Sequence, residues 1–163
     1  MPFAYYRKLS PRQKRIYDRS DEVTSVAVPV PGRFAPLVEN LRRALESGRR
    51  RETEGQSQTL VSSLCDAWRV ARVKTKVLEK RPAHHWGELH GLYEPAAAGS
   101  YPVLTVWMRT AKRIQVVAFK TFFRTLLHEL NHHLDYTLLK LEDSFHTEGF
   151  YSRESSLLKQ LID

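Results

Sequence analysis

The residues best suited to chemistry lie in one short segment, His128-Glu129-Leu130-Asn131-His132. Its pattern is H-E-x-x-H, in which two histidines four residues apart share one helix face and can hold one metal ion. Glu129 follows His128 directly, so its carboxylate can reach a water on the metal without displacing a protein ligand. The metal lowers the pKa of that water, and Glu129 can take its proton and pass it to a leaving amine. The pattern therefore predicts zinc-dependent hydrolysis of peptide bonds, with Glu129 as the catalytic residue.

A catalytic zinc site needs a third protein ligand and one open position. Three residues further along the chain are candidates: His146, Glu154 and Asp135. Asp135 lies only three residues after His132 on the same helix, so it is awkward as a ligand but well placed to orient an imidazole. We expect His146 to be the third ligand, because imidazole is the commonest metal-binding side chain, and keep Glu154 as the alternative.

The segment 128–132, a spacer, and His146-Thr147-Glu148-Gly149-Phe150 together resemble the SprT-like metallopeptidases and the related WLM group. In those proteins an H-E-x-x-H helix is followed by a third histidine in an H-G-x-x-F motif. His146 and Phe150 match that motif, whereas Thr147 stands where the family has glycine. The resemblance covers residues 57–163 and implies His146 as the third ligand, zinc as the metal, and a minimal zincin-like domain. Relatives in the family cleave proteins crosslinked to DNA, so DNA-associated proteins are an expected substrate class.

Other residues near the motif have weaker claims. Tyr151 is a candidate for stabilising the oxyanion of the transition state, with a core tyrosine as the alternative, and Arg153 has the same standing. His133 lies beside the motif on another helix face, so we expect a surface or supporting residue and no metal contact. No spacing links the remaining histidines to a metal: His84, His85 and His90.

The pattern of apolar residues predicts an α+β fold. Helical spacing indicates helices over about 36–47, 57–71 with Ser57 as cap, 116–139, and from 148 onwards with Thr147 as cap. Residues 49–58 are polar and are predicted as a loop. Short β-rich runs predict three strands at 73–77, 86–93 and 103–108. We expect a small, mostly antiparallel three-stranded sheet packed on the long active-site helix with flanking helices. Residues 1–56 are expected to form a basic N-terminal arm with one helix, and 57–163 the zincin-like metallopeptidase core.

The charge of the 163-residue chain is unevenly distributed. The first 127 residues carry 23 basic and 11 acidic side chains, and the last 36 carry 3 and 7. An acidic end suits a divalent cation, and a basic body suits a polyanion. The basic residues that can contact nucleic acid include Arg49, Arg50, Arg51, Lys74 and Lys76.

The single cysteine, Cys65, cannot form an internal disulfide, and no long apolar stretch or signal-peptide core is present. A cytoplasmic location without membrane contact is therefore the expectation.

The sequence is consistent with two alternative functions. The first is a zinc metallopeptidase acting on a protein or peptide substrate. The second is a nucleic-acid-binding protein with a structural or vestigial metal site, which rests on charge alone. A structural zinc site takes four protein ligands and has no use for Glu129, so the sequence favours the peptidase.

Overall fold

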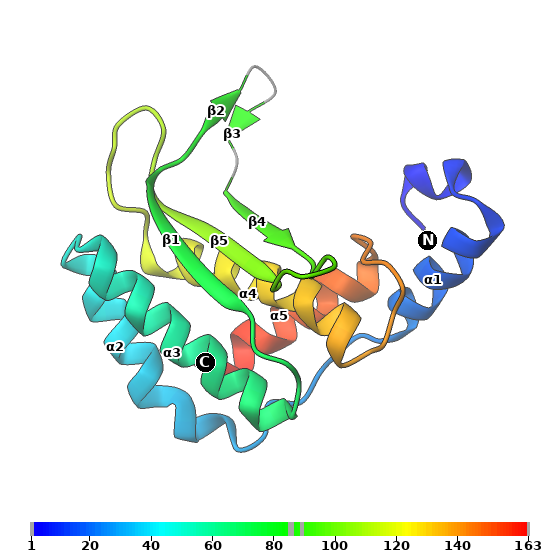
Figure 1. Ribbon diagram of the computed structural model, residues 1–163, viewed down its shortest axis with the longest axis horizontal. Helices are drawn as coiled ribbons and strands as arrows, with labels where there is room; N and C mark the ends of the chain where they lie inside the picture. The colour runs from blue at the N-terminus through cyan, green and yellow to red at the C-terminus, as the bar shows by residue number, and fades with distance from the viewer. Residues whose placement is uncertain (1, 85–86, 89, 163) are drawn as a thin grey trace.

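We describe the protein from a computed structural model, which covers residues 2–84, 87–88 and 90–162 (Figure 1). The chain in these ranges is α+β, with five α-helices, two 3₁₀ helices and five short strands. The helices are η1 (Ala4–Lys8), α1 (Pro11–Glu22), η2 (Pro31–Phe34), α2 (Ala35–Glu46), α3 (Arg50–Trp68), α4 (Phe119–Thr137) and α5 (Glu148–Ile162). The strands are β1 (Lys74–Lys80), β2 (Ala83–His84), β3 (Gly87–Glu88), β4 (Gly91–Glu94) and β5 (Val103–Arg109). None of the helices in these ranges is long and apolar enough to cross a bilayer.

The main sheet has the order β1-β5-β4, with β5 in the centre. β1 runs parallel to β5, with Lys74 opposite Val103, and β4 runs antiparallel to β5, with Gly91 opposite Val106. The prediction of a mostly antiparallel sheet is therefore wrong, because the sheet is mixed. A parallel pair needs a connection of a dozen or more residues, and the chain between Lys80 and Val103 provides it.

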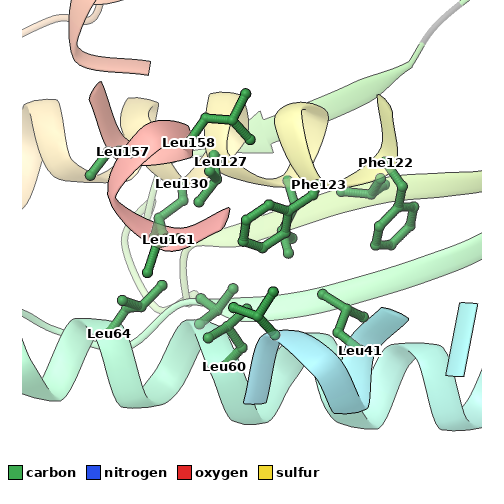
Figure 2. Packing of buried hydrophobic residues seen from close by; sticks show 14 of the residues in the cluster. Leu41, Leu60, Leu64, Phe122, Phe123, Leu127, Leu130, Leu157, Leu158 and Leu161 are labelled. Carbon is green, nitrogen blue, oxygen red and sulfur yellow. The ribbon is translucent and has the colours of Figure 1, made fainter. Parts of the chain in front are cut away.

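Helices cover one face of this sheet. α3 packs against β1, α4 packs against β4 and β5, and α2 and α5 pack on α3 and α4 from the other side (Figure 1). Figure 2 shows side chains from four helices meeting in the core between these elements. Its fully buried members include Leu41, Leu60, Leu64, Phe122, Phe123, Leu127, Leu130 and Leu157. Burying one such side chain contributes about 1.5–3 kcal/mol, so this core fixes the position of α4.

Helix α3 begins earlier than the sequence predicts. The stretch predicted as a loop, residues 49–58, is mostly helical, and Ser57 is a buried residue within α3 and not its cap. Arg50 pairs with Glu54 one turn further on, and both half-buried side chains also bond to the backbone of Val77 on β1. The charged residues of this stretch therefore belong to helix α3 and not to a loop.

The first 56 residues contain α1, α2 and the start of α3, which is more helix than the expected arm with one helix. α1 starts at a capping box in which Gln13 N–H donates to Ser10 Oγ and Ser10 N–H donates to Gln13 Oε1. α2 follows the predicted apolar spacing, and Leu41 and Leu45 on it are fully buried in the core. Both helices pack against α5.

The two C-terminal helices match their predictions closely. α4 is slightly shorter than the predicted 116–139, since Val116 lies before it in a β-bridge with Arg109. Thr147 caps α5 as expected, because the N–H of Phe150 donates to its Oγ1 at 2.9 Å. The predicted inner face of α5 is buried and consists of Phe150, Leu157, Leu158 and Leu161.

Candidate metal centre

Three imidazoles converge where α4 meets the loop before α5. His128 and His132 lie one turn apart on α4, and His146 comes from the loop. The Nε2 atom of His146 lies 3.2 Å from Nε2 of His128 and 2.9 Å from Nε2 of His132. Two nitrogens bound to one tetrahedral zinc ion are about 3.3 Å apart, so these side chains fit a zinc ion with small adjustments. Among the residues the structure describes, they form the one group of His, Cys, Asp and Glu with metal-binding spacing.

The outward nitrogens of two of these rings are held by oxygen atoms. His128 Nδ1 lies 2.5 Å from Oε1 of Glu154, and His132 Nδ1 lies 2.7 Å from Oγ of Ser144. A ring that donates its Nδ1–H in this way presents a lone pair at Nε2, which faces the shared centre. Glu154 thus contacts the far side of His128 instead of the centre, and its second oxygen accepts from Arg124 at 3.0 Å. The alternative in which Glu154 replaces His146 as the third ligand is not supported by this arrangement.

A buried chain of polar contacts continues from His132 into the protein. Ser144 Oγ donates to Oδ2 of Asp135 at 2.7 Å, and Oδ1 of Asp135 pairs with Arg153 at 3.0 Å. Asp135 and Arg153 are fully buried, and burial raises the pKa of Asp135 to about 6. Asp135 was expected to orient an imidazole, and its contact with His132 runs through Ser144, which the sequence reasoning missed. Arg153 was a candidate for the transition state, but its burial against Asp135 removes it from any surface that substrate can reach.

Glu129 is buried beside the three histidines. Its Oε1 lies 3.9 Å from Nε2 of His128, and its Oε2 has no hydrogen-bond partner among the described residues. Burial, with Glu154 adding to the effect, raises the pKa of Glu129 to about 7, while His128 opposes the shift. A carboxylate with this pKa, one oxygen of which lies near the Nε2 atom of His128, is suited to accept a proton from a bound water.

Gly91 of β4 leaves the space that the Glu129 side chain occupies. A Cβ atom at position 91 would lie 2.9 Å from Cγ of Glu129 and 2.8 Å from Cγ2 of Thr125. The sequence reasoning missed this residue, although a glycine in a strand often marks a close approach by another group. Gly91 therefore allows β4 and α4 to pack closely enough to hold Glu129 in place.

Two of the three histidines, His132 and His146, are held in the uncharged form that binds metals. Burial lowers the pKa of His132 to about 3, with further lowering by His128 and His146. Burial also lowers the pKa of His146, followed by the effect of His128. The buried ring of Phe150 packs beneath all three imidazoles, with centroids 4.6 to 5.2 Å away. Three imidazole rings around one point form a donor set of the kind zinc prefers.

His146 is held by the N-terminal segment, residues 3–23, which lies beside the loop between α4 and α5 (Figure 1). The hydroxyl of Tyr5 donates to the backbone oxygen of His146 at 2.6 Å. Ser20 Oγ contacts Oγ1 of Thr147 at 3.0 Å, and the N–H of Gly149 donates to Asp21 at 3.0 Å. The part of the chain outside the family resemblance thus contributes directly to the candidate centre.

Helices α1 and α5 meet at Gly149, where there is no room for a side chain. A Cβ atom there would lie 2.6 Å from the backbone oxygens of both Ser20 and Asp21. Arg153 donates to the backbone oxygens of Ser20, in the last turn of α1, and of Val23, its C-cap residue, so its guanidinium also satisfies the end of that helix. Because Gly149 permits this approach, α1 supports the turn that carries His146.

Other predicted residues lie around the centre. Tyr151 is 41% exposed, and its ring centroid lies 5.6 Å from that of His146. His133 lies off the centre as expected, but it is buried and bonded to Tyr93 and to the backbone of Ala71. Cys65 is fully buried, and burial raises the pKa of its thiol to about 12. His85 and Trp86 lie outside the described residues.

The basic residues expected to contact nucleic acid lie away from the histidines. Arg49 and Arg50 form ion pairs with Glu52 and Glu54 on α3. Three more are exposed, on α3 and on the outer face of β1: Arg51, Lys74 and Lys76. These residues form part of the protein surface, and two of their charges are already partly neutralised.

The histidines open into a cleft of about 410 Å³ between α4 and β4. It is lined by His90, Gly91, Arg124, Thr125, His128, Glu129, His132, His146 and Glu154. His90, which sequence spacing did not connect with the motif, thus borders the same cleft. No protein-family model, no curated protein and no solved structure matches the chain.

Proposed function

We propose that the protein is a zinc-dependent peptidase. The observation that supports this most strongly is the convergence of three Nε2 atoms beside a buried, unpaired carboxylate oxygen of Glu129. A structural zinc site takes four protein ligands, whereas a catalytic site takes three and leaves one position open. The described residues offer three nitrogens and a neighbouring base, which is the catalytic pattern.

Zinc bound by these histidines would supply a Lewis acid that acidifies a water and polarises the scissile carbonyl. Glu129 then accepts a proton and returns it to the leaving amine, a role for which its raised pKa suits it. Glu154 and Ser144 keep the imidazoles of His128 and His132 in one orientation through their Nδ1 atoms. Tyr151, an exposed phenol whose ring centroid lies 5.6 Å from that of His146, is the candidate for contacting the oxyanion.

The substrate that best fits the cleft is an extended peptide. β4 is an edge strand, since β5 alone pairs with it among the described strands, and it forms one wall of the cleft. An edge strand can take up an extended peptide through main-chain hydrogen bonds. Such a peptide would carry one carbonyl past the histidines, as peptide hydrolysis requires.

The net charge of the first 127 residues supports a narrower version, in which the substrate is a protein bound to DNA. Binding to DNA should then weaken steeply with salt, because phosphate contacts release counterions. The competing function, nucleic-acid binding with a structural metal, leaves the buried position of Glu129 without a purpose.

Elemental analysis of protein never exposed to a chelator tests the proposal. We expect about one zinc ion per chain. The zinc-loaded protein should cleave an unfolded protein such as casein, and removal of zinc should abolish that cleavage. Protein without zinc would contradict the proposal, and so would cleavage that survives zinc removal.

A further inference from the structure

The groove beside the histidines extends along α4 beyond the candidate metal centre. Arg124, His128, His132 and Tyr136 are four residues apart in turn, so they share one face of α4. A second hollow of about 240 Å³ shares Gly91, Glu129 and His132 with the main cleft. These shared walls make the two hollows parts of one groove.

A third hollow, also about 240 Å³, continues the groove. It shares Tyr93, Pro95 and Tyr136 with the second hollow. The rest of its lining is Ala71, Ala96, Pro102, His133 and Thr137, so it carries no acidic or basic side chain apart from His133. Both ring nitrogens of His133 are engaged, Nε2 with the backbone oxygen of Ala71 at 2.6 Å and Nδ1 with the hydroxyl of Tyr93 at 2.9 Å.

Tyr93 and Tyr136 both line this end of the groove. Their rings stack with centroids 6.1 Å apart and planes 20° apart. Their hydroxyls are engaged elsewhere, that of Tyr93 with Nδ1 of His133 at 2.9 Å and that of Tyr136 with Asp143 at 3.3 Å. The surface left for a ligand is therefore aromatic and aliphatic carbon.

We propose that this third hollow is a specificity pocket for a large apolar or aromatic side chain of the peptide substrate. The proposal rests on the proposed peptidase function and adds the chemistry that selects the substrate. The pocket is continuous with the candidate metal centre through Tyr93, Tyr136 and the second hollow. An aromatic side chain there would contact the stacked tyrosines and leave water.

The direction of β4 says on which side of the cleaved bond this side chain lies. β4 runs from Gly91, beside Glu129, to Tyr93, beside the pocket. A peptide pairing antiparallel with β4, the slightly more stable arrangement, passes the pocket before it reaches the histidines. Because a strand advances about 3.3 Å per residue, the selected side chain lies about two residues on the amino-terminal side of the bond.

Hydroxamates test this without a known substrate, because the hydroxamate group binds zinc. Acetyl-Phe-Gly-hydroxamate places an aromatic ring two residues before the metal, and acetyl-Gly-Gly-hydroxamate lacks the ring. Binding of each to the zinc-loaded protein is measured by calorimetry. We expect the phenylalanine compound to bind about tenfold more tightly, the effect of burying roughly half of a large apolar side chain.

Two variants test whether the tighter binding of the phenylalanine compound arises in the third hollow. Ala96 is exposed in a loop and lines the pocket, so Ala96→Trp fills the pocket without disturbing the core and should remove the preference. Tyr101 is 82% exposed and lines none of the three hollows, so Tyr101→Ala is the matched control and should keep it.

Equal binding of the two compounds would overturn the pocket, as would a preference that survives Ala96→Trp. A benzyl-succinyl hydroxamate, which places its ring on the carboxyl-terminal side, should gain nothing. A preference for that compound instead would overturn the assignment. If no hydroxamate binds the zinc-loaded protein, the proposed function itself fails and the pocket fails with it.

Discussion

The two sides of the histidine cluster are held by contacts of very different reach along the chain. His128 and His132 belong to one helix, and a separation of four residues is enough to align their rings. His146 belongs to a loop supported by Tyr5 and by Ser20, through bonds that span 141 and 127 residues. The helical side therefore has a geometry that the backbone imposes, and the loop side has one that tertiary packing imposes.

This difference predicts how each side responds to substitution. Changes on α4 should alter chemistry while the zinc-binding geometry persists. Changes around His146 should alter zinc affinity, since His146 lies in a loop whose position depends on those contacts. Four substitutions test this difference, and the first has the largest expected effect.

Glu129→Gln tests the helical side. Glutamine keeps the size of the side chain but cannot accept a proton, so peptide hydrolysis should fall by a factor on the order of 10² to 10⁴. Zinc should remain bound, because the histidines of α4 are unchanged. Activity assays with elemental analysis on the same preparation measure both. A variant with zinc and full activity would remove Glu129 from the mechanism.

His146→Ala tests the loop side. Loss of one of three ligands should weaken zinc binding on the order of 10² to 10³-fold, measured by competition with a chelating dye. Glu154→Ala is the comparison, because it removes a partner of His128 and should cost about tenfold. If Glu154→Ala has the larger effect, the assignment of the third ligand is wrong.

Ser144→Ala removes the oxygen that joins His132 to Asp135. His132 would keep its place on α4 but lose the group that fixes its ring, so zinc affinity should fall about tenfold. The absorption spectrum of the cobalt-substituted protein would report a changed ligand geometry. Ser100→Ala, in the exposed loop before β5, is a control that should leave both measurements unchanged.

Tyr5→Phe removes a single hydrogen bond to the backbone of His146. A hydrogen bond contributes about 0.5–1.5 kcal/mol net, so zinc affinity should fall about threefold to tenfold with little loss of fold stability. Tyr6→Phe is the matched control, since the hydroxyl of Tyr6 contacts Asp18 and not the loop. Equal zinc affinities for the two variants would show that the hydrogen bond from Tyr5 does not position His146.

The same contrast explains what could be predicted from sequence. The spacing within α4 and the cap at Thr147 are local, and both helices lie close to their predicted places. The support of His146 by residues 3–23 depends on contacts between distant segments, and no local pattern signals it. Ser144 and Gly91 escaped notice for the same reason, because their roles depend on partners in other elements.

The errors in the predicted fold have equally specific causes. The many charged residues at 49–58 favour a loop over a helix in a sequence-based prediction. Arg50 and Glu54 are nevertheless good helix formers with favourable spacing. The sheet was expected to be mostly antiparallel because its strands are close in sequence. The direction of β1 relative to β5 depends on a crossover, which strand patterns do not encode.

The close approach of α1 and α5 at Gly149 has a consequence for folding. A helix such as α4 forms within about a microsecond, whereas contacts between segments more than 120 residues apart form only after a large loop has closed. We therefore expect the two histidines of α4 to be aligned during folding before His146 joins them. A partly folded chain would hold zinc weakly and cleave nothing, so the activity would appear only in fully folded molecules.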